Sequence, residues 1–192
     1  METDEEIIVR VASPEDVDFA LPIVAEMESS ARARGTGISK RDPMDIKKKI
    51  LQGNAVIAFT KSGIWAGFSY IQAWEGGRFV SNSGLIVVPE FRGLKVAAAI
   101  KKKIFELSRS LYPSAKIFSI TTGLPVMKLN SRLGFEPVTY TEITTDSSFW
   151  AGCKSCINYP ILAGHHFANC LCTAMLFTPP ELKDPVLLST AD

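Results

Sequence analysis

Short apolar runs alternate with amphipathic stretches along this chain, and their order predicts a mixed α/β fold. Runs rich in β-branched and aromatic residues predict strands at residues 7–11, 55–59, 65–73, 79–88, 115–121, 138–140 and 170–177. Helical spacing and helix-start signals predict helices at about residues 14–34, 44–51, 96–111 and 125–133. Consecutive strands in the first half favour antiparallel pairing, whereas the strand–helix–strand unit in the middle favours one parallel pair.

Local signals mark the boundaries of several predicted helices. Ser13 and Pro14 are typical of a helix start, and Pro22 predicts a kink or break in the helix that follows. Gly134 ends the fourth helix, because glycine tolerates a left-handed backbone. In the third helix, the lysines at residues 101–103 fall mostly off the apolar face.

One domain, residues 1–178, accounts for these elements, since a chain of 192 residues can bury a real core. Within it, residues 144–168 show no clear period beyond a small helix near residues 147–151, and we interpret this stretch as an insert that contains cysteine and histidine. Residues 179–192 are expected to form a flexible tail.

Composition and charge exclude several classes of protein. Hydrophobic residues make up 46% of the chain and charged residues 21%, which is ordinary for a globular protein. The net charge of +1 gives no electrostatic case for nucleic acid or a membrane surface as the main partner. The start, METDEEII, lacks the features of a signal peptide, and the longest apolar runs are too short to span a bilayer. We therefore expect a soluble, cytoplasmic protein.

The junction between the fourth strand and the third helix has the features of an anion site. A helix that begins at the end of a strand presents unpaired N–H groups and the positive end of its dipole. Gly93 and the alanines at residues 97–99 keep bulk away from that backbone, and Arg92 and Lys95 add positive charge. A pyrophosphate could approach there. The alternative is that the alanines only allow close packing of helix on sheet.

This junction resembles the phosphate-binding motif of the GNAT acetyltransferase superfamily. The family pattern is Arg or Gln, two residues, Gly, one residue, then Gly or Ala, and Arg92 and Ala97 match it. Residues 85–91 are similar to the family's fourth strand, and residues 130–137, NSRLGFEP, resemble a second family motif. The resemblance implies a mixed, mostly antiparallel sheet of about seven strands, with helices on both faces, and acetyl-CoA as the donor substrate.

The resemblance also implies which residues hold the donor. Backbone groups of three residues would pair with the pantetheine arm: Ile86, Val87 and Val88. The phosphates would lie against a loop of seven residues: Arg92, Gly93, Leu94, Lys95, Val96, Ala97 and Ala98. Lys95 departs from the family, which usually has glycine there, and its side chain would crowd the loop if the position needs a positive φ.

The catalytic residues of the family are only partly matched. Many members have a tyrosine that protonates the departing CoA thiolate, and Asn130 stands in its place here. The asparagine common at the end of the fifth strand is replaced by Gly123. Ser131 is the nearest substitute by position, so Asn130 and Ser131 are the candidate catalytic residues, with a water as an alternative acid.

Polar and basic residues indicate where an amine-bearing acceptor would bind. The basic loop contributes four candidates: Arg32, Arg34, Lys40 and Arg41. Ser81 and Ser83 interrupt the fourth strand and could line the same pocket or face solvent. Arginine suits carboxylate recognition, which favours an anionic acceptor, although an ordinary solvated loop would have the same composition.

The run of motifs is similar to short GNAT proteins associated with bacterial arginine biosynthesis. That resemblance implies acylation of the α-amine of glutamate by acetyl-CoA or a relative such as succinyl-CoA. The alternative is a catalytically inactive GNAT-fold module that binds a ligand or a metal and acts by interaction. The sequence leaves a homodimer open.

All cysteines of the chain lie in one window, at Cys153, Cys156, Cys170 and Cys172. His165 and His166 lie between the two pairs. Four thiolates, or three thiolates and one imidazole, would suit a structural zinc ion. On a strand, Cys170 and Cys172 would share one face and could equally be small buried residues. Buried or free thiols, a zinc site and a redox pair all stay open.

Overall fold

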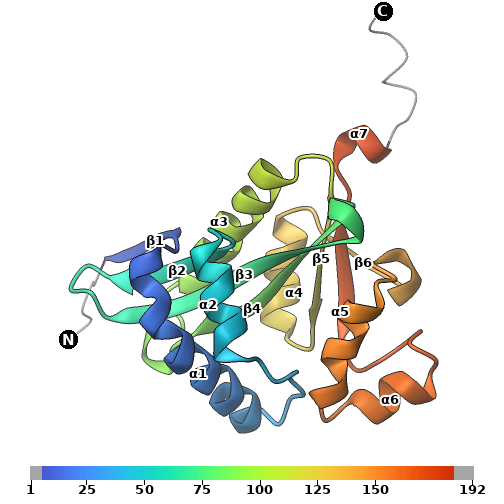
Figure 1. Cartoon of the computed structure of the whole chain (residues 1–192), viewed down its shortest axis with the longest axis horizontal. Coiled ribbons are helices and arrows are strands. Elements are labelled where there is room, and N and C mark those ends of the chain that lie inside the picture. The colour runs from blue at the N-terminus through green and yellow to red at the C-terminus, as the bar shows by residue number, and fades with distance from the viewer. Residues whose placement is uncertain (1–5, 184–192) are drawn as a thin grey trace, which may run out of the picture.

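A seven-stranded mixed sheet forms the centre of the computed structural model, which describes residues 6–183 (Figure 1). Its strands are β1 (Ile7–Val11), β2 (Ala55–Thr60), β3 (Trp65–Trp74), β4 (Phe79–Val87), β5 (Lys116–Thr121), β6 (Glu136–Val138) and β7 (Thr173–Phe177). They lie in the order β1-β2-β3-β4-β5-β7-β6, and every neighbouring pair is antiparallel except β4 and β5. The predicted sheet, with its one parallel pair, is confirmed.

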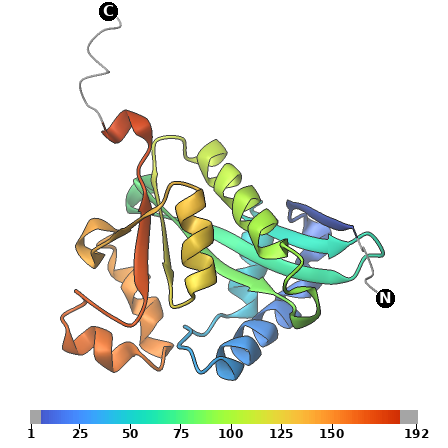
Figure 2. The ribbon, with the colours of Figure 1, turned by 180° about the vertical axis from the view of Figure 1, so that it is seen from behind.

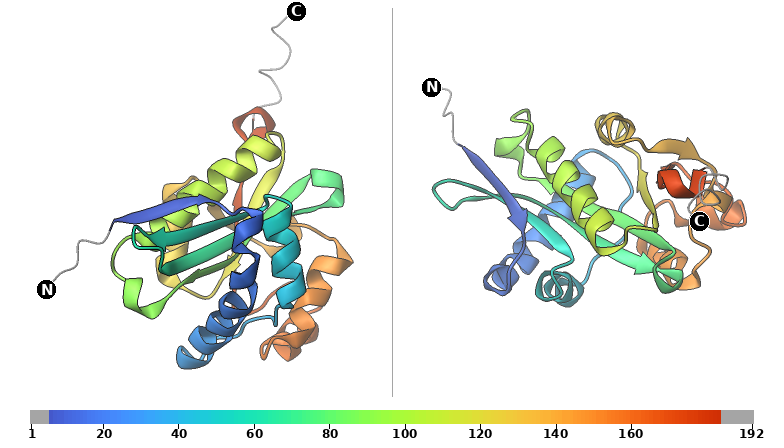
Figure 3. Two further views of the ribbon diagram at one scale, coloured as in Figure 1. Left: turned by 60° about the vertical axis from the view of Figure 1, so that its left-hand side comes forward. Right: turned by 90° about the horizontal axis from the view of Figure 1, so that it is seen from above.

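Helices cover both faces of this sheet, as expected. The α-helices are α1 (Ala20–Ala33), α2 (Pro43–Leu51), α3 (Val96–Leu111), α4 (Leu124–Arg132), α5 (Ser147–Ala151), α6 (Tyr159–Gly164) and α7 (Pro180–Lys183). Short 3-10 helices lie at Pro14–Phe19, Glu75–Gly77, Pro89–Phe91, Tyr140–Glu142 and Gly152–Ser155. Helices α1 and α2 cover one face, while α3 and α4 cover the other (Figures 1 and 2). The right-hand view of Figure 3 shows the same layers from above.

Three clusters of buried side chains hold the layers together. The first packs α3 against the strands, with Ile100 and Ile104 fully buried. The second packs α1 and α2 against the opposite face around Phe68. The third joins the far end of the sheet to α5 and α6 through Phe118 and Phe149, whose rings meet edge to face at 5.1 Å. Residues 144–168 are therefore packed on the sheet.

Two element boundaries differ from the predictions for local reasons. The first helix changes from a 3-10 to an α-helix at Ala20, so Pro22 lies in the first turn of α1, where its missing N–H is not needed. The sixth strand ends at Val138, because Thr139 starts a capping box with Glu142. The predicted strand at residues 138–140 is thus displaced towards the N-terminus.

The last predicted strand needs correction, and the predicted tail is described only in part. Strand β7 begins at Thr173, so Cys170 and Cys172 lie in the segment before it and do not share a strand face. In the predicted flexible tail, residues 180–183 form the short helix α7. The rest of that tail, residues 184–192, lies outside the described residues.

Among the helices of residues 6–183, none combines the length and apolar character that crossing a bilayer requires.

Candidate active site

The one parallel strand pair opens into a gap after three residues of pairing. Strands β4 and β5 are paired only from Phe79 to Ser81 on β4. Beyond that point β4 stays paired with β3, and β5 stays paired with β7. The edges that β4 and β5 turn toward each other are therefore free to bond an extended ligand. This is the place where the pantetheine arm was expected.

A bulge at Gly84 shapes the β4 side of the gap. Phe68 pairs with Ile86 and Tyr70 with Ser83, so one β3 residue opposes two residues of β4. Gly84 has φ +64°, and a Cβ there would lie 2.5 Å from Cε1 of Tyr70. Glycine is required at this position both for its backbone and for the closeness of the tyrosine ring.

The loop that enters α3 presents a run of free backbone amides. The first bonds of the helix go from the N–H groups of Ala98 and Ala99 to the carbonyl of Lys95. Within the described chain, the N–H groups of residues 93–97 donate no hydrogen bond. Gly93 has φ +83° with no atom near its missing Cβ, which leaves the loop open. Such a run at a helix N-terminus fits a pyrophosphate group.

Lys95 has the positive φ at which its side chain was expected to crowd the loop. Its φ and ψ are 62° and 9°, the left-handed region that glycine occupies without strain. The side chain is exposed, so it does not fill the loop. The lysine therefore occupies this position with a strained backbone.

Replacing Lys95 by glycine is expected to raise the free energy of unfolding by about 0.5–1 kcal/mol, because it removes a left-handed non-glycine residue. Urea denaturation of both proteins measures the difference. Lys95→Ala is the control, since it removes the charge but keeps the Cβ. Equal effects of the two substitutions would show that strain at Lys95 is not the cause.

Arg92 directs its side chain to α1. Its Nε donates to the carbonyl of Val87 at 3.1 Å, and its Nη2 donates to Oγ of Ser30 at 2.6 Å. Nη2 also lies 3.3 Å from Oε1 of Glu26. These bonds fix the end of β4 relative to α1. The loop therefore offers a phosphate mainly its amides and the field of the Arg92 charge.

A cleft of about 470 Å³ extends from the gap between β4 and β5 to the segment that joins α1 and α2. Residues 81–85 of β4 and residues 118–122 of β5 and its end line the first part. Residues 36–41 line the other end. A space of this size is typical of a small-molecule site.

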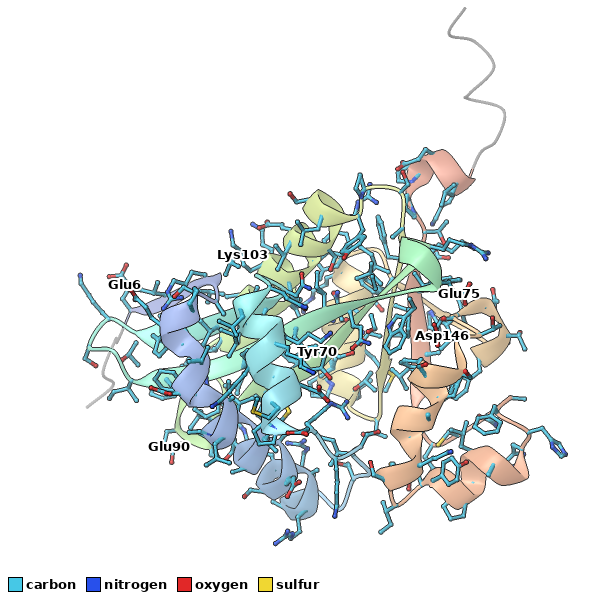
Figure 4. All side chains as sticks on the ribbon, viewed as in Figure 1. Glu6, Tyr70, Glu75, Glu90, Lys103 and Asp146 are labelled. Carbon is cyan, nitrogen blue, oxygen red and sulfur yellow. The ribbon has the colours of Figure 1, made fainter. Side chains whose placement is uncertain are left out.

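Three of the four predicted basic residues line this cleft. Arg34, Lys40 and Arg41 do so, whereas Arg32 is exposed and is not among the lining residues. The Nε of Arg41 donates to the hydroxyl of Tyr70 at 2.8 Å, which anchors the guanidinium to β3. Tyr70 lies near the middle of the sheet (Figure 4).

The charges of Arg92 and Glu26 both act on Arg34. Arg34 is exposed as a residue, but partial burial of its guanidinium lowers its pKa from the ordinary value, and the charge of Arg92 lowers it further. Glu26 acts in the opposite direction. This end of the cleft is therefore rich in positive charge, which favours an anionic ligand.

Both predicted serines of β4 line the cleft. Ser81 is buried, and its hydroxyl accepts a hydrogen bond from Nε1 of Trp74 at 3.0 Å. Ser83 is half-buried. Between them, Asn82 donates to Oγ of Ser108 at 2.8 Å, while its buried Oδ1 has no partner. These polar residues interrupt the apolar pattern of β4 at the point where the strand lines the cleft.

Residues 144–168 form a second wall at the end of the cleft that residues 36–41 line. The N–H of Lys40 donates to Oγ of Ser155 at 2.9 Å, and Gly37 lies against Cys156 and Asn158. These contacts join segments that lie more than a hundred residues apart in the sequence. They pack residues 36–41 against the insert. No sequence pattern signalled this pairing.

The start of the same insert is tied to the β3–β4 hairpin by Glu75. Its Oε1 accepts bonds from Oγ1 of Thr144 and the N–H of Thr145, both at 2.8 Å. The bond from Thr144, followed by the one from Thr145, holds the pKa of Glu75 below its ordinary value. Figure 4 shows Glu75 and Asp146 on these neighbouring segments.

The cysteines also line the cleft, but they do not form a metal site. Within residues 6–183, no group of three or more His, Cys, Asp or Glu side chains is placed to hold a metal ion. All of the cysteines are free and half-buried, and burial raises the pKa of Cys172 to about 12. His165 and His166 are exposed. The zinc interpretation of Cys153, Cys156, Cys170 and Cys172 is not supported.

The predicted catalytic pair lies away from the cleft. Asn130 is fully buried, and its Nδ2 is 3.6 Å from Sδ of Met175, while its Oδ1 has no partner in the described part of the chain. Ser131 is exposed. Neither residue is among those that line the cleft.

Sequence reasoning missed Lys101. It was expected to fall off the apolar face of α3, but it is 2% exposed and lines the cleft beside the gap. Within the described residues its ammonium makes no hydrogen bond or ion pair, and its Nζ lies 5.5 Å from the centre of the Phe135 ring. Burial lowers the pKa of Lys101 to about 7. Because Lys101 is the first of three consecutive lysines, its burial could not be distinguished in the sequence.

Comparison of the sequence with family models and with curated proteins finds no match. Comparison of the fold with solved structures finds many. N-acetylglutamate synthase from Neisseria gonorrhoeae, complexed with coenzyme A and N-acetyl-glutamate, aligns at a TM-score of 0.64 and 12% identity. The alignment covers 92% of this chain and 36% of that one, so the chain spans about a third of that enzyme.

Two further structures align along most of both chains. Rv2747 from Mycobacterium tuberculosis, in complex with CoA and NLQ, has a TM-score of 0.62 and 17% identity, with 89% of this chain and 98% of that chain covered. A GNAT superfamily phosphinothricin acetyltransferase from Sinorhizobium meliloti, in complex with AcCoA, has a TM-score of 0.60 and 16% identity, covering 91% and 89%. Together with the splayed strands and the amide-lined loop, these likenesses establish that the chain has the GNAT fold.

Proposed function

We propose that this protein is a GNAT-type N-acyltransferase that moves an acetyl or similar acyl group from acyl-CoA to the amine of a small anionic acceptor. The observation that carries the proposal is the cleft that runs from the gap between β4 and β5 to an end lined by Arg34, Lys40 and Arg41. The free amides of residues 93–97 lie outside this lining, in the loop that follows β4. A donor and an acceptor would meet between these amides and the basic residues.

The donor would lie along β4 with its phosphates on the loop before α3. The backbone of Ile86, Val87 and Val88 would pair with the pantetheine arm, and residues 92–98 would surround the pyrophosphate. An N–H of β4 near the Gly84 bulge would stabilise the oxyanion that forms when an amine attacks the thioester carbonyl.

The acceptor is proposed to be glutamate, as in arginine biosynthesis. The arginine residues at the acceptor end suit a carboxylate, and Arg41 is held in place by Tyr70. N-acetyl-glutamate is the ligand named with the Neisseria gonorrhoeae enzyme. The cytoplasmic location stays a prediction from the sequence, and a homodimer stays open.

Calorimetric titration with CoA, followed by assay of thiol release with a panel of amines, tests the proposal. We expect CoA to bind and to raise the melting temperature with its concentration. Glutamate should support faster thiol release than glutamine, because the two differ in charge but hardly in shape.

The outcomes separate the alternatives. Binding of CoA with turnover only on basic or aromatic amines would contradict an anionic acceptor and leave the acyltransferase intact. No binding of CoA would instead favour the catalytically inactive module, in which Asn130 replaces the tyrosine of the family pattern.

A further inference from the structure

A buried amine without a partner lies where the proposed donor would be cleaved. Lys101 projects from α3 into the cleft, and its Nζ makes no hydrogen bond within the described residues. Asn82 bonds through Nδ2 to Ser108 on the same helix, and its buried Oδ1 also lacks a partner among residues 6–183. Because buried polar groups are normally satisfied, two such groups on one cleft point to a ligand that completes them.

The position of Lys101 along β4 can be read from the contacts of α3. Ile100 lies against Gly67 beside the carbonyl of Ile86, and Ser108 bonds to Asn82. The helix therefore runs back along the strand, and residue 101 lies near the level of Ile86 and Leu85. That level is next to the Gly84 bulge, where the thioester of a donor held at residues 92–98 would be placed.

The two faces of the sheet supply different groups to this point. The basic acceptor residues come from the segment between α1 and α2 on one face, whereas Lys101 comes from α3 on the other. Lys101 therefore reaches the proposed reacting centre from the face of the sheet opposite to the basic residues, where it does not compete with the acceptor for space.

We infer that Lys101 is a catalytic residue that donates a proton to the departing CoA thiolate, in place of the tyrosine that this chain lacks at position 130. This role rests on the proposed acyltransferase function. It differs from the sequence-based assignment to Asn130 and Ser131, neither of which lines the cleft.

The step balances as follows. The lone pair of the acceptor nitrogen forms the bond to the thioester carbon, and the carbon–sulfur bond breaks with its electron pair on sulfur. A proton passes from the Lys101 ammonium to that sulfur and leaves a neutral amine. The acceptor nitrogen loses its proton to water, and the Lys101 amine takes one from water before the next cycle.

The surroundings of Lys101 suit an acid that works near neutral pH. Burial alone lowers its pKa to about 7, and no charged group contributes. The cleft beside it is lined by four polar groups that do not ionise in this range: Asn82, Ser83, Ser119 and Thr121. An ammonium with this pKa can protonate a thiolate whose ordinary pKa is about 8.5.

Two other ionisable groups near the cleft are less suitable. Tyr140 is buried, and its hydroxyl donates to the carbonyl of Cys172 at 2.8 Å. Burial, followed by the neighbouring cysteines, raises the pKa of Tyr140 above its ordinary value. Cys172 is likewise a weak donor, because its pKa is raised to about 12.

Lys101→Met tests the role, with Lys102→Met on the same helix as the control. We expect kcat to fall about 100-fold or more in Lys101→Met and to stay unchanged in Lys102→Met. Calorimetry with CoA should give the same Kd for all three proteins within about threefold, and thermal melting should show that they fold.

The pH dependence distinguishes a proton donor from a structural residue. The ratio of wild-type kcat to Lys101→Met kcat cancels the ionisation of the acceptor. That ratio should be largest below pH 7 and fall as the pH rises, because Lys101 then loses its proton. A ratio that is constant, or that grows with pH, would overturn the role of Lys101.

The remaining outcomes separate this inference from the proposed function. Wild-type turnover that Lys101→Met retains would overturn the role of Lys101 and leave the acyltransferase standing. A wild-type protein that binds no CoA and releases no thiol would overturn the proposed function and this role with it.

Discussion

Replacing Lys101 by methionine is expected to stabilise the protein strongly below pH 7 and to remove part of its pH dependence. Lys101 has a pKa of about 7 in the folded chain, whereas the ordinary pKa of a lysine is 10.5. Below pH 7 it is charged in both states, so the folded state carries the full cost of a buried ammonium. Methionine fills similar space without that cost.

The sign of the pH effect follows from proton counting. Between pH 7 and pH 10.5 the unfolded chain holds the proton that the folded chain has lost, so the free energy of unfolding rises with pH. At 1.36 kcal/mol per pKa unit, the difference between the two pKa values of Lys101 corresponds to roughly 5 kcal/mol at most. The free energy of unfolding of Lys101→Met should lack this rise with pH. At pH 6 it should exceed that of the wild type by a similar amount.

Urea denaturation at pH 6, 7, 8 and 9 measures the effect. Lys102→Met is the matched control, because the Lys102 side chain is 74% exposed and makes only a 4.0 Å ion pair with Glu106. Its curve should follow the wild type at every pH. Parallel pH slopes for the wild type and Lys101→Met would show that the amine is not buried as described.

Substituting Gly84 by alanine should lower the free energy of unfolding by about 3 kcal/mol, with strain and steric overlap both contributing. The new Cβ would lie 2.5 Å from Cε1 of Tyr70 and 2.9 Å from Cε of Met27. Both neighbours are buried, so the tyrosine cannot move freely. A shift of Tyr70 would also displace Arg41, and acyl transfer should fall.

Gly76→Ala provides a control with nearly the same φ. Its φ is +65° against +64° for Gly84, but no atom lies within 4 Å of the new Cβ. This substitution should lower the free energy of unfolding by about 1–2 kcal/mol, because only the left-handed backbone opposes it. Equal losses in the two variants, measured by urea denaturation, would remove the close contact with Tyr70 as a reason for glycine in the bulge.

The loop of free amides before α3 was the part of the candidate site that could be predicted from sequence. Its features are local: Gly93, the small residues 97–99 and a helix start directly after a strand. Local backbone geometry decides whether amides are free, so a short stretch carries the signal. The question raised by Lys95 was local too, and its φ of +62° answers it.

The acceptor end could be predicted only in part. The basic composition of residues 32–41 was visible, but which of its side chains line a cleft depends on the insert that packs against it. The hydrogen bond between Lys40 and Ser155 joins segments with no shared pattern. The spacing of the cysteines suggested a metal, yet their placement does not bring together a ligand set.

The sequence by itself determined the order of strands and helices, the one parallel pair and the loop of free amides, since periodicity, turn residues and caps act over a few positions. Only the tertiary structure decided that the pairing of β4 with β5 ends at Ser81, that residues 36–41 meet the insert, and that Lys101 is buried while Lys102 is not. The physical reason is that burial and desolvation depend on everything that packs around a group, and those neighbours come from distant parts of the chain.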